Sequence, residues 1–221
     1  TIAGQLAFVV GSYHLLKHNK GKGVMIGHMD DMDPRVVTVI GAGVAGTQSI
    51  LKAIDNKALV KVVDSSQSKL DDLKSKYGTE NVEYILSSKD SIQVSVNESD
   101  LVIGSVYVVG KEAPKVVTKD MLSSMNPGTV MVDVSIDQGG CFETSKPTTH
   151  DSPTFLENEI VHYCVTNMPG AVPLTATEAL NKVSLSYVEN LANNGIQNAL
   201  ESDEHLRNGL NILDGRIVHP G

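Results

Sequence analysis

The chain has 221 residues, of which 41% are hydrophobic and 20% charged, a composition typical of a globular protein that buries a substantial core. Its formal net charge of −8 argues against nucleic acid or an anionic membrane as a partner, because no excess of basic side chains is present to contact phosphates. No apolar run approaches the ~20 residues that a membrane-spanning helix needs, and no charged-then-apolar leader opens the chain. We therefore expect a cytoplasmic protein that binds a small metabolite.

Neither cysteines nor acidic clusters indicate a metal site. Cys141 and Cys164 are too few for a disulfide framework, and we expect both thiols to be buried. Asp30, Asp31 and Asp33 lie close together, but their spacing does not match an EF-hand loop and the distal glutamate is missing. We therefore predict a solvated loop there and no bound metal.

The first twenty residues predict an amphipathic helix. Its apolar face is expected to consist of Leu6, Val9, Val10, Tyr13 and Leu16. Glycines at 21 and 23 end the helix, and Val24 to Ile26 is expected to form a short edge strand. A nucleotide-binding fold does not require a helix ahead of its first strand, so residues 1–22 are interpreted as a connection to another domain or subunit.

Residues 36–64 predict a strand, a tight turn, a helix and a second strand. The β-branched run Val36 to Ile40 leads directly into a GxGxxG sequence, and the second apolar run ends on Asp64. In such a turn Gly41 permits the sharp bend, Gly43 leaves room for a diphosphate, and Gly46 lets the helix pack close to the strand. The free N–H groups and positive dipole end of the helix then face the phosphates.

Asp64 favours one dinucleotide over the other. It lies 18 residues beyond Gly46, at the carboxyl end of the second strand, where a carboxylate can accept both ribose hydroxyls of an adenosine. A 2′-phosphate would meet a like charge there, and Ser65, Ser66 and Gln67 supply no arginine to bind it. We therefore predict NAD rather than NADP. A glycine turn that binds nothing and a methyl-donor nucleoside held by the same acid are the alternatives.

The rest of the chain alternates strands with helices, which predicts a doubly wound parallel sheet. Strands are expected at residues 82–86, 100–104, 129–134 and 160–166, and helices at 66–77, 88–97, 118–125 and from 172 to about 191. Ligands of such sheets lie beyond the carboxyl ends of the strands, so Asp133 and Asp137 are the first candidates for chemistry. We expect Asp137 to transfer protons, with turn capping as its alternative, and Asp133 to be a structural carboxylate bonded to nearby N–H groups.

Five segments together resemble one known family. They are IAG at Ile2–Gly4, IGAGVAG at Ile40–Gly46, DLVIG at Asp100–Gly104, VDVSIDQGGCFETSKPTTH at Val132–His150 and HYCVTNMPGAVP at His162–Pro173. This pattern resembles alanine dehydrogenase over essentially the whole chain, and the QGGCFE and NMPGAVP blocks are more specific than the glycine fingerprint. The NAD(H)-binding subunit of proton-translocating transhydrogenase shares the fold but differs around the QGG block, and it is the alternative.

The resemblance implies a hexameric enzyme that converts L-alanine, NAD and water to pyruvate, ammonium and NADH. Asp137 matches the family's catalytic acid near the nicotinamide, where a carboxylate can serve the proton transfers that form and collapse a carbinolamine. The cofactor-binding positions implied by the resemblance and by the glycine turn are Gly41, Gly43, Val44, Ala45, Gly46, Asp64, Lys69, Ser87, Val106, Tyr107, Val134, Asp137, Val165, Asn167 and Met168.

The resemblance also implies a division into domains. The family's substrate domain carries a lysine and an arginine for the substrate and a catalytic histidine, and none of the seven histidines here lies in a matching motif. We expect an α/β chain in which residues 23–170 form a Rossmann-type NAD-binding domain, residues 1–22 a connecting helix, and residues 171–221 a helical segment that packs on the incomplete second domain. Such a chain would bind NAD and be inactive alone. The alternative is a non-catalytic NAD-binding or assembly module that associates with other subunits through its helices.

Overall fold

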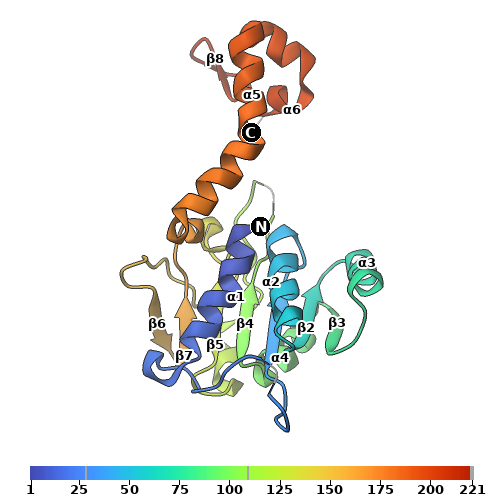
Figure 1. The fold of residues 1–221 in the computed structure, drawn as a ribbon. Helices are drawn as coiled ribbons and strands as arrows, with labels where there is room; N and C mark the ends of the chain where they lie inside the picture. Colours follow the sequence, from blue (N-terminus) through green and yellow to red (C-terminus); the bar gives the residue numbers. More distant parts are fainter. Residues whose placement is uncertain (28, 109, 220–221) are drawn as a thin grey trace. The chain divides into compact units, whose positions relative to one another are not determined.

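A seven-stranded sheet organises the amino-terminal part of the chain, and its strand order is β3-β2-β1-β4-β5-β7-β6 (Figure 1). The strands are β1 (Val36–Ile40), β2 (Leu59–Asp64), β3 (Val82–Leu86), β4 (Leu101–Gly104), β5 (Val130–Asp133), β6 (Thr154–Glu157) and β7 (Ile160–Tyr163). All neighbouring strands pair in parallel except β6 and β7, which pair antiparallel. This arrangement confirms the predicted doubly wound parallel sheet.

The computed structural model describes residues 1–27, 29–108 and 110–219, and these fall into two compact units, Thr1–Ala171 and Val172–Gly221. The sheet and its covering helices make up the first unit. His28, two residues before the aspartates of the predicted solvated loop, lies outside the described residues. No helix within the described ranges is long and apolar enough to cross a lipid bilayer.

Helices cover both faces of the sheet, and a separate hydrophobic cluster fills each side. On one face α1 (Ile2–His14), α2 (Val44–Asp55) and α3 (Gln67–Tyr77) bury strand residues such as Val39 and Leu101. On the other face α4 (Lys89–Glu98) and the 3-10 helix η2 (Lys119–Ser124) bury Val102 and Met131. Neighbouring residues of one strand thus point to opposite clusters, as in a sheet buried on both faces.

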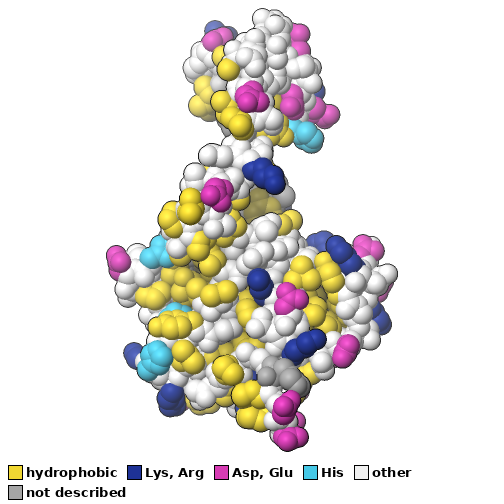
Figure 2. All heavy atoms as spheres, in the orientation of Figure 1, with side chains coloured by type: hydrophobic (Ala, Val, Ile, Leu, Met, Phe, Trp, Pro, Cys, Tyr) yellow, Lys and Arg dark blue, Asp and Glu magenta, His cyan; other side chains and the backbone are white. Residues whose placement is uncertain are grey.

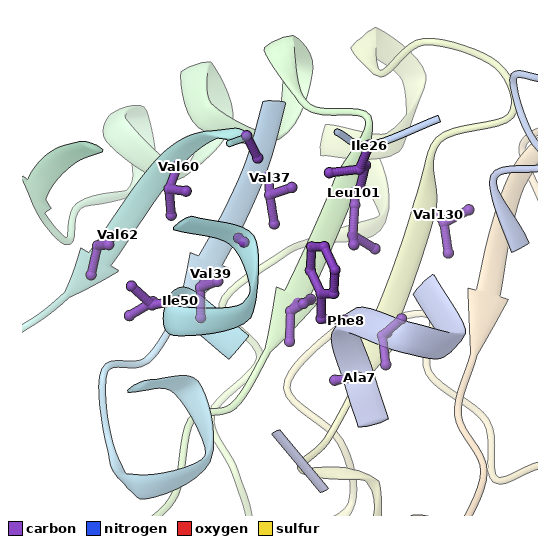
Figure 3. Close-up of a cluster of buried hydrophobic side chains, with 14 of the residues drawn as sticks. Ala7, Phe8, Ile26, Val37, Val39, Ile50, Val60, Val62, Leu101 and Val130 are labelled. Carbon is purple, nitrogen blue, oxygen red and sulfur yellow. The ribbon is translucent and has the colours of Figure 1, made fainter. Parts of the chain in front are cut away.

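The predicted opening helix is α1, which ends at His14, and its predicted apolar face is only partly correct, because Leu6 and Val10 pack against the core whereas other members are exposed. Val9 and Tyr13 are 54% and 53% exposed. The buried residues of the helix are instead Gly4, Ala7, Phe8, Gly11 and His14. Ala7 and Phe8 lie in one cluster with Ile50 of α2 and with strand residues (Figure 3). Small residues on this face let α1 lie close to α2 and the sheet, which apolar periodicity alone does not reveal.

Several further elements follow their predicted boundaries closely. The hydroxyl of Ser66 caps α3 by accepting a hydrogen bond from Lys69 N at 3.4 Å. A reciprocal pair of hydrogen bonds between Ser88 and Ser91 caps α4. The predicted edge strand at 24–26 is wrong, because this segment is irregular and Ile26 simply packs into the core. The predicted helix at 118–125 is a 3-10 helix, and β6 was not predicted.

The second unit is mainly helical. Helix α5 (Pro173–Ser202) begins with a proline in its first turn and breaks at Gly195, whose φ of +74° is left-handed. The helix predicted to end at about residue 191 therefore extends to Ser202, with a kink at Gly195. A short helix α6 (Glu204–Asn208) and a hairpin of β8 (Ile212–Leu213) and β9 (Arg216–Ile217) complete the unit.

Basic and acidic side chains are interspersed on the face of the molecule shown in Figure 2. The chain carries 18 basic and 26 acidic residues in all.

Candidate functional site

Three glycines shape the turn between β1 and α2, and each does so differently. Gly41 has a left-handed φ of +95°, which a residue with a side chain rarely adopts. A Cβ on Gly46 would lie 1.8 Å from Gly41 O, so only glycine lets α2 pack this close to the strand. A Cβ on Gly43 would meet no atom within 4 Å. Gly41 and Gly46 are therefore required by the fold, whereas Gly43 borders open space.

The first turn of α2 presents hydrogen-bond donors to that space. Gly43 is the N-cap residue, and the first helical bond runs from Thr47 N to Gly43 O at 2.9 Å. The N–H groups of Val44, Ala45 and Gly46 precede this bond and have no carbonyl partner within the helix. Together with the positive end of the helix dipole, they form a geometry suited to an anionic group such as a diphosphate.

Asp64 ties the end of β2 to the glycine turn. Its Oδ2 accepts a hydrogen bond from Ala42 N at 2.7 Å, and its Oδ1 accepts one from Ser66 N at 2.9 Å. Lys69 Nζ lies 3.9 Å from Oδ2. Each carboxylate oxygen keeps a further lone pair for another donor. The acid is thus both a structural acceptor and a group that can receive a ligand's hydroxyls.

A cavity of about 570 Å³ lies in front of these groups. It is lined by Thr1, Gly41, Gly43, Val44, Ala45, Asp64, Ser65, Lys69, Ser105, Val106 and Tyr107. A second hollow of about 240 Å³ shares Ala45, Ser105 and Tyr107 with it and adds Val134, Ser135, Asp137 and Gln138. The shared residues make the two hollows one crevice along the carboxyl ends of the strands, where ligands of such sheets bind.

The two acids after β5 have separate environments. Asp133 is fully buried and accepts hydrogen bonds from Ser135 N, Cys141 N and Ser145 Oγ at 2.9, 2.8 and 2.5 Å. It is therefore a structural carboxylate that holds the loop after β5, as expected from the sequence. Asp137, in the 3-10 helix η3 (Ile136–Gln138), is exposed and lines the smaller hollow. Only one of the two acids thus faces the crevice.

The structure gathers most, though not all, of the predicted site residues. Gly41, Gly43, Val44, Ala45, Asp64, Lys69, Val106 and Tyr107 line the larger hollow, and Val134 and Asp137 line the smaller one. Gly46 lies behind the turn, and Ser87 is attached to the site through a 2.9 Å hydrogen bond from its N to Asp64 O.

Besides Gly46 and Ser87, three further predicted residues lie outside both hollows. The side chains of Val165 and Met168 belong to the hydrophobic core, with exposed fractions of 0% and 4%. Asn167 is exposed, has a left-handed φ of +50°, and accepts a hydrogen bond at its carbonyl from His150 Nε2 at 3.3 Å. Any contact of the two core residues with a ligand would have to use backbone atoms.

Five polar lining residues were not among the predicted cofactor-binding residues, namely Thr1, Ser65, Ser105, Ser135 and Gln138. Ser105 directly follows β4 and Ser135 lies two residues after β5, so the rule that ligands lie beyond strand ends could have identified them. Ser105 Oγ donates to Gly41 O at 2.7 Å, and Ser135 Oγ donates to Val106 O at 2.8 Å. Gln138 and Thr1 carry no comparable signal, since their places depend on the path of a loop and on the packing of α1.

Neither cysteine is suited to nucleophilic chemistry. Cys141 and Cys164 are both buried. Burial raises the pKa of the Cys141 thiol, and the negative charge of Asp133 raises it further. The same two causes raise the pKa of Cys164 to about 12. Both thiols therefore stay protonated at neutral pH, in keeping with the expected role as small buried residues.

Comparison with known proteins gives a consistent result. Residues 7–220 match the family described as alanine dehydrogenase/PNT, C-terminal domain. The chain is 46% identical to alanine dehydrogenase of Halomonas elongata over 219 residues, which cover 99% of this chain and 59% of that protein. It is 44% identical to alanine dehydrogenase of Mycolicibacterium smegmatis, covering 98% of this chain and 58% of that protein. The chain thus spans about three fifths of the length of these relatives.

Solved structures show the same pattern. An L-alanine dehydrogenase superposes with a TM-score of 0.94 at 43% identity, covering 99% of this chain and 60% of that one. A transhydrogenase from Sinorhizobium meliloti superposes with a TM-score of 0.81 at 22% identity, which shows a shared fold.

Proposed function

Because the chain belongs to the alanine dehydrogenase/PNT C-terminal domain family, we propose that its crevice binds NAD and that it forms the cofactor-binding part of an alanine dehydrogenase. The proposed reaction of the whole protein converts L-alanine, NAD and water to pyruvate, ammonium and NADH. One observation carries the proposal. The free N–H groups at the start of α2 face a cavity that also contains the carboxylate of Asp64.

The adenosine end of the cofactor is assigned to the part of the cavity near Asp64. The carboxylate would accept the ribose hydroxyls, while the diphosphate would bind the N–H groups of Val44 and Ala45. A 2′-phosphate would be repelled by this buried acid. Lys69, whose exposed ammonium group lies 3.9 Å from the same carboxylate, would offset part of that repulsion, but Ser65, Ser66 and Gln67 beside the acid supply no arginine to bind the phosphate. These charges support NAD over NADP.

The nicotinamide end is assigned to the smaller hollow, beside Val134 and Asp137. When bound, NAD supplies a hydride acceptor. We propose that Asp137 accepts and returns the protons of the amine and hydroxyl groups as substrate is converted. Asn167 is proposed to border the same end, and Val165 and Met168 to contribute backbone atoms and to hold the segment in place.

Further properties of the whole protein are proposed on the family resemblance alone. The lysine, arginine and histidine of the family's substrate site would come from the part of the relatives that this chain does not match. The second unit would pack on that substrate domain, and the protein would assemble as a cytoplasmic hexamer.

Two assays test the proposal together. The first is a titration of the 221-residue chain with NADH, followed by nucleotide fluorescence, which is free of tryptophan background because the sequence contains no Trp. We expect NADH to bind saturably, NAD to displace it, and S-adenosylmethionine not to displace it. Competition by the methyl donor alone would favour the alternative ligand.

The second assay measures NADH formation with L-alanine. We expect turnover by the full-length gene product and none by the 221-residue chain. A full-length product that binds NADH and does not oxidise L-alanine would remove the enzyme assignment. Turnover by the 221-residue chain alone would show that the substrate-binding groups lie within it.

A further inference from the structure

Helix α1 begins at the crevice and packs along the side of α2 (Figure 1). Thr1, which precedes the helix, lines the larger hollow. One turn later, a Cβ on Gly4 would lie 2.0 Å from Ala45 O and 2.7 Å from Ala45 C. These are backbone atoms, so no side-chain rotation could make room for the extra carbon. Glycine is therefore the one residue that fits position 4 at this spacing of the helices.

The atoms that Gly4 approaches belong to the proposed diphosphate-binding turn. Ala45 is the second residue of α2 and lines both hollows. Its carbonyl is part of the peptide unit that carries the N–H of Gly46, one of the three free donors. A displacement of this carbonyl would rotate the peptide and move the donors. The distance between the backbones of Gly4 and Ala45 thus affects the positions of the N–H donors at the start of α2.

Two polar contacts hold the helices in register around this point. Ser49 Oγ, which is fully buried, donates to Gly4 O at 2.7 Å. Gln5 Nε2 donates to Gln48 Oε1 at 2.9 Å. A buried hydrogen bond between one helix's backbone and the other's side chain restricts both sliding and rotation. These bonds therefore tie the first turn of α1 to the second turn of α2, directly after the free donors.

We propose that Gly4 is a positioning residue of the dinucleotide site, and that α1 forms a rear wall that sets the N–H groups at the start of α2 in place. The inference rests on the proposed nucleotide binding and adds a role for a helix that the glycine turn itself does not require. Gly4 touches no ligand in this account and acts through Ala45.

The identity of residue 4 is itself informative. Gly4 is the third residue of α1, and glycine within a helix is less favourable than alanine, so its presence there calls for a compensating contact. Gly11 provides an internal comparison in the same helix. A Cβ there would lie 2.5 Å from Leu101 Cδ1, the end of a flexible side chain that packs on the sheet. Alanine at position 11 would disturb packing away from the glycine turn.

The test uses Gly4→Ala with Gly11→Ala as the matched control, both in the 221-residue chain. Affinity for NADH is measured by fluorescence titration well below the unfolding temperature, and the Tm is measured without ligand. We expect Gly4→Ala to raise the Kd by at least about tenfold, since small displacements of binding groups are costly. Gly11→Ala should leave the Kd within about twofold, whatever it does to the Tm.

A second pair keeps the inference testable if Gly4→Ala does not fold. Ser49→Ala removes the bond to Gly4 O, and we expect a smaller rise in Kd in the same direction. Ser95→Ala is its control, because Ser95 is a buried helical serine in α4 whose Oγ donates to Ser91 O at 2.7 Å. We expect no change in Kd from this control.

The possible outcomes separate the inference from the proposed function. Absence of NADH binding by the unaltered chain would overturn the proposed function and this inference with it. Suppose instead that the unaltered chain binds NADH normally. An unchanged Kd in whichever of the variants Gly4→Ala and Ser49→Ala fold would then overturn the inference alone. Equal weakening by Gly4→Ala and Gly11→Ala would also overturn it, because the effect would then belong to α1 in general.

Discussion

Replacing Gly43 by alanine should lower the affinity for NADH and leave the stability of the fold nearly unchanged. The backbone at Gly43 has φ −74° and ψ −165°, an extended conformation that alanine adopts readily. No heavy atom lies within 4 Å of the position its Cβ would take. The new methyl group would therefore occupy only the space assigned to the diphosphate.

The expected magnitudes differ sharply for folding and binding. Loss of a favourable N-cap residue opposes the gain from a less flexible unfolded chain, so the free energy of unfolding should stay within about 1 kcal/mol of the original. Forcing a methyl group against a bound diphosphate should cost about 1–3 kcal/mol, as overpacking does elsewhere. NADH affinity should therefore fall by roughly 5- to 150-fold.

Fluorescence titration with NADH and urea unfolding measure these two quantities. Gly209→Ala serves as control, because Gly209 has an ordinary φ of −83° and its Cβ would lie 3.4 Å from Leu206 O, a normal contact in the second unit. We expect this variant to bind NADH like the unaltered chain. Unchanged NADH affinity in Gly43→Ala would refute the placement of the diphosphate. A large loss of stability would show that the fold itself requires glycine at position 43.

Further predictions concern the acid, the thiols and a buried histidine. Asp64→Ala should weaken NADH binding by ~1–3 kcal/mol and also lower stability, because Ala42 N loses its acceptor; unchanged affinity in the titration would show that the acid is misassigned. Cys141 and Cys164 should resist a thiol reagent in the folded chain and react once urea unfolds it, and rapid labelling of the folded chain would contradict their burial. Burial lowers the pKa of His162 below its usual 6.5, so the unfolded chain binds the proton more readily and stability should fall as pH drops through about 6.5. Urea unfolding at several pH values should show that the free energy of unfolding depends less on pH in His162→Gln. An unchanged pH dependence would contradict the role given to His162.

The sheet was predictable because each strand carries its own local signal. Runs such as Val82 to Leu86 combine β-branched and apolar residues between turn formers, and β3 has the predicted bounds. The glycine turn and the acid at the end of β2 are likewise local patterns with a known geometric meaning. Crossover handedness then places these strand ends together without further information.

Features that depend on contacts between distant segments were not predictable in this way. The exposure of Val9 and Tyr13 reflects the choice of a small-residue face on α1, and that choice is set by how closely α2 and the sheet approach. The antiparallel strand β6 at the sheet edge has only four residues and no alternating pattern. The positions of Gln138 and Thr1 at the crevice depend on tertiary packing as well.

The most direct test of the central claim is a crystal structure of the chain with NADH. We expect the diphosphate within hydrogen-bond distance of the N–H groups of Val44 and Ala45, the adenosine ribose at Asp64, and the nicotinamide beside Asp137. A crevice that stays empty at saturating NADH, or a nucleotide bound elsewhere on the chain, would contradict it.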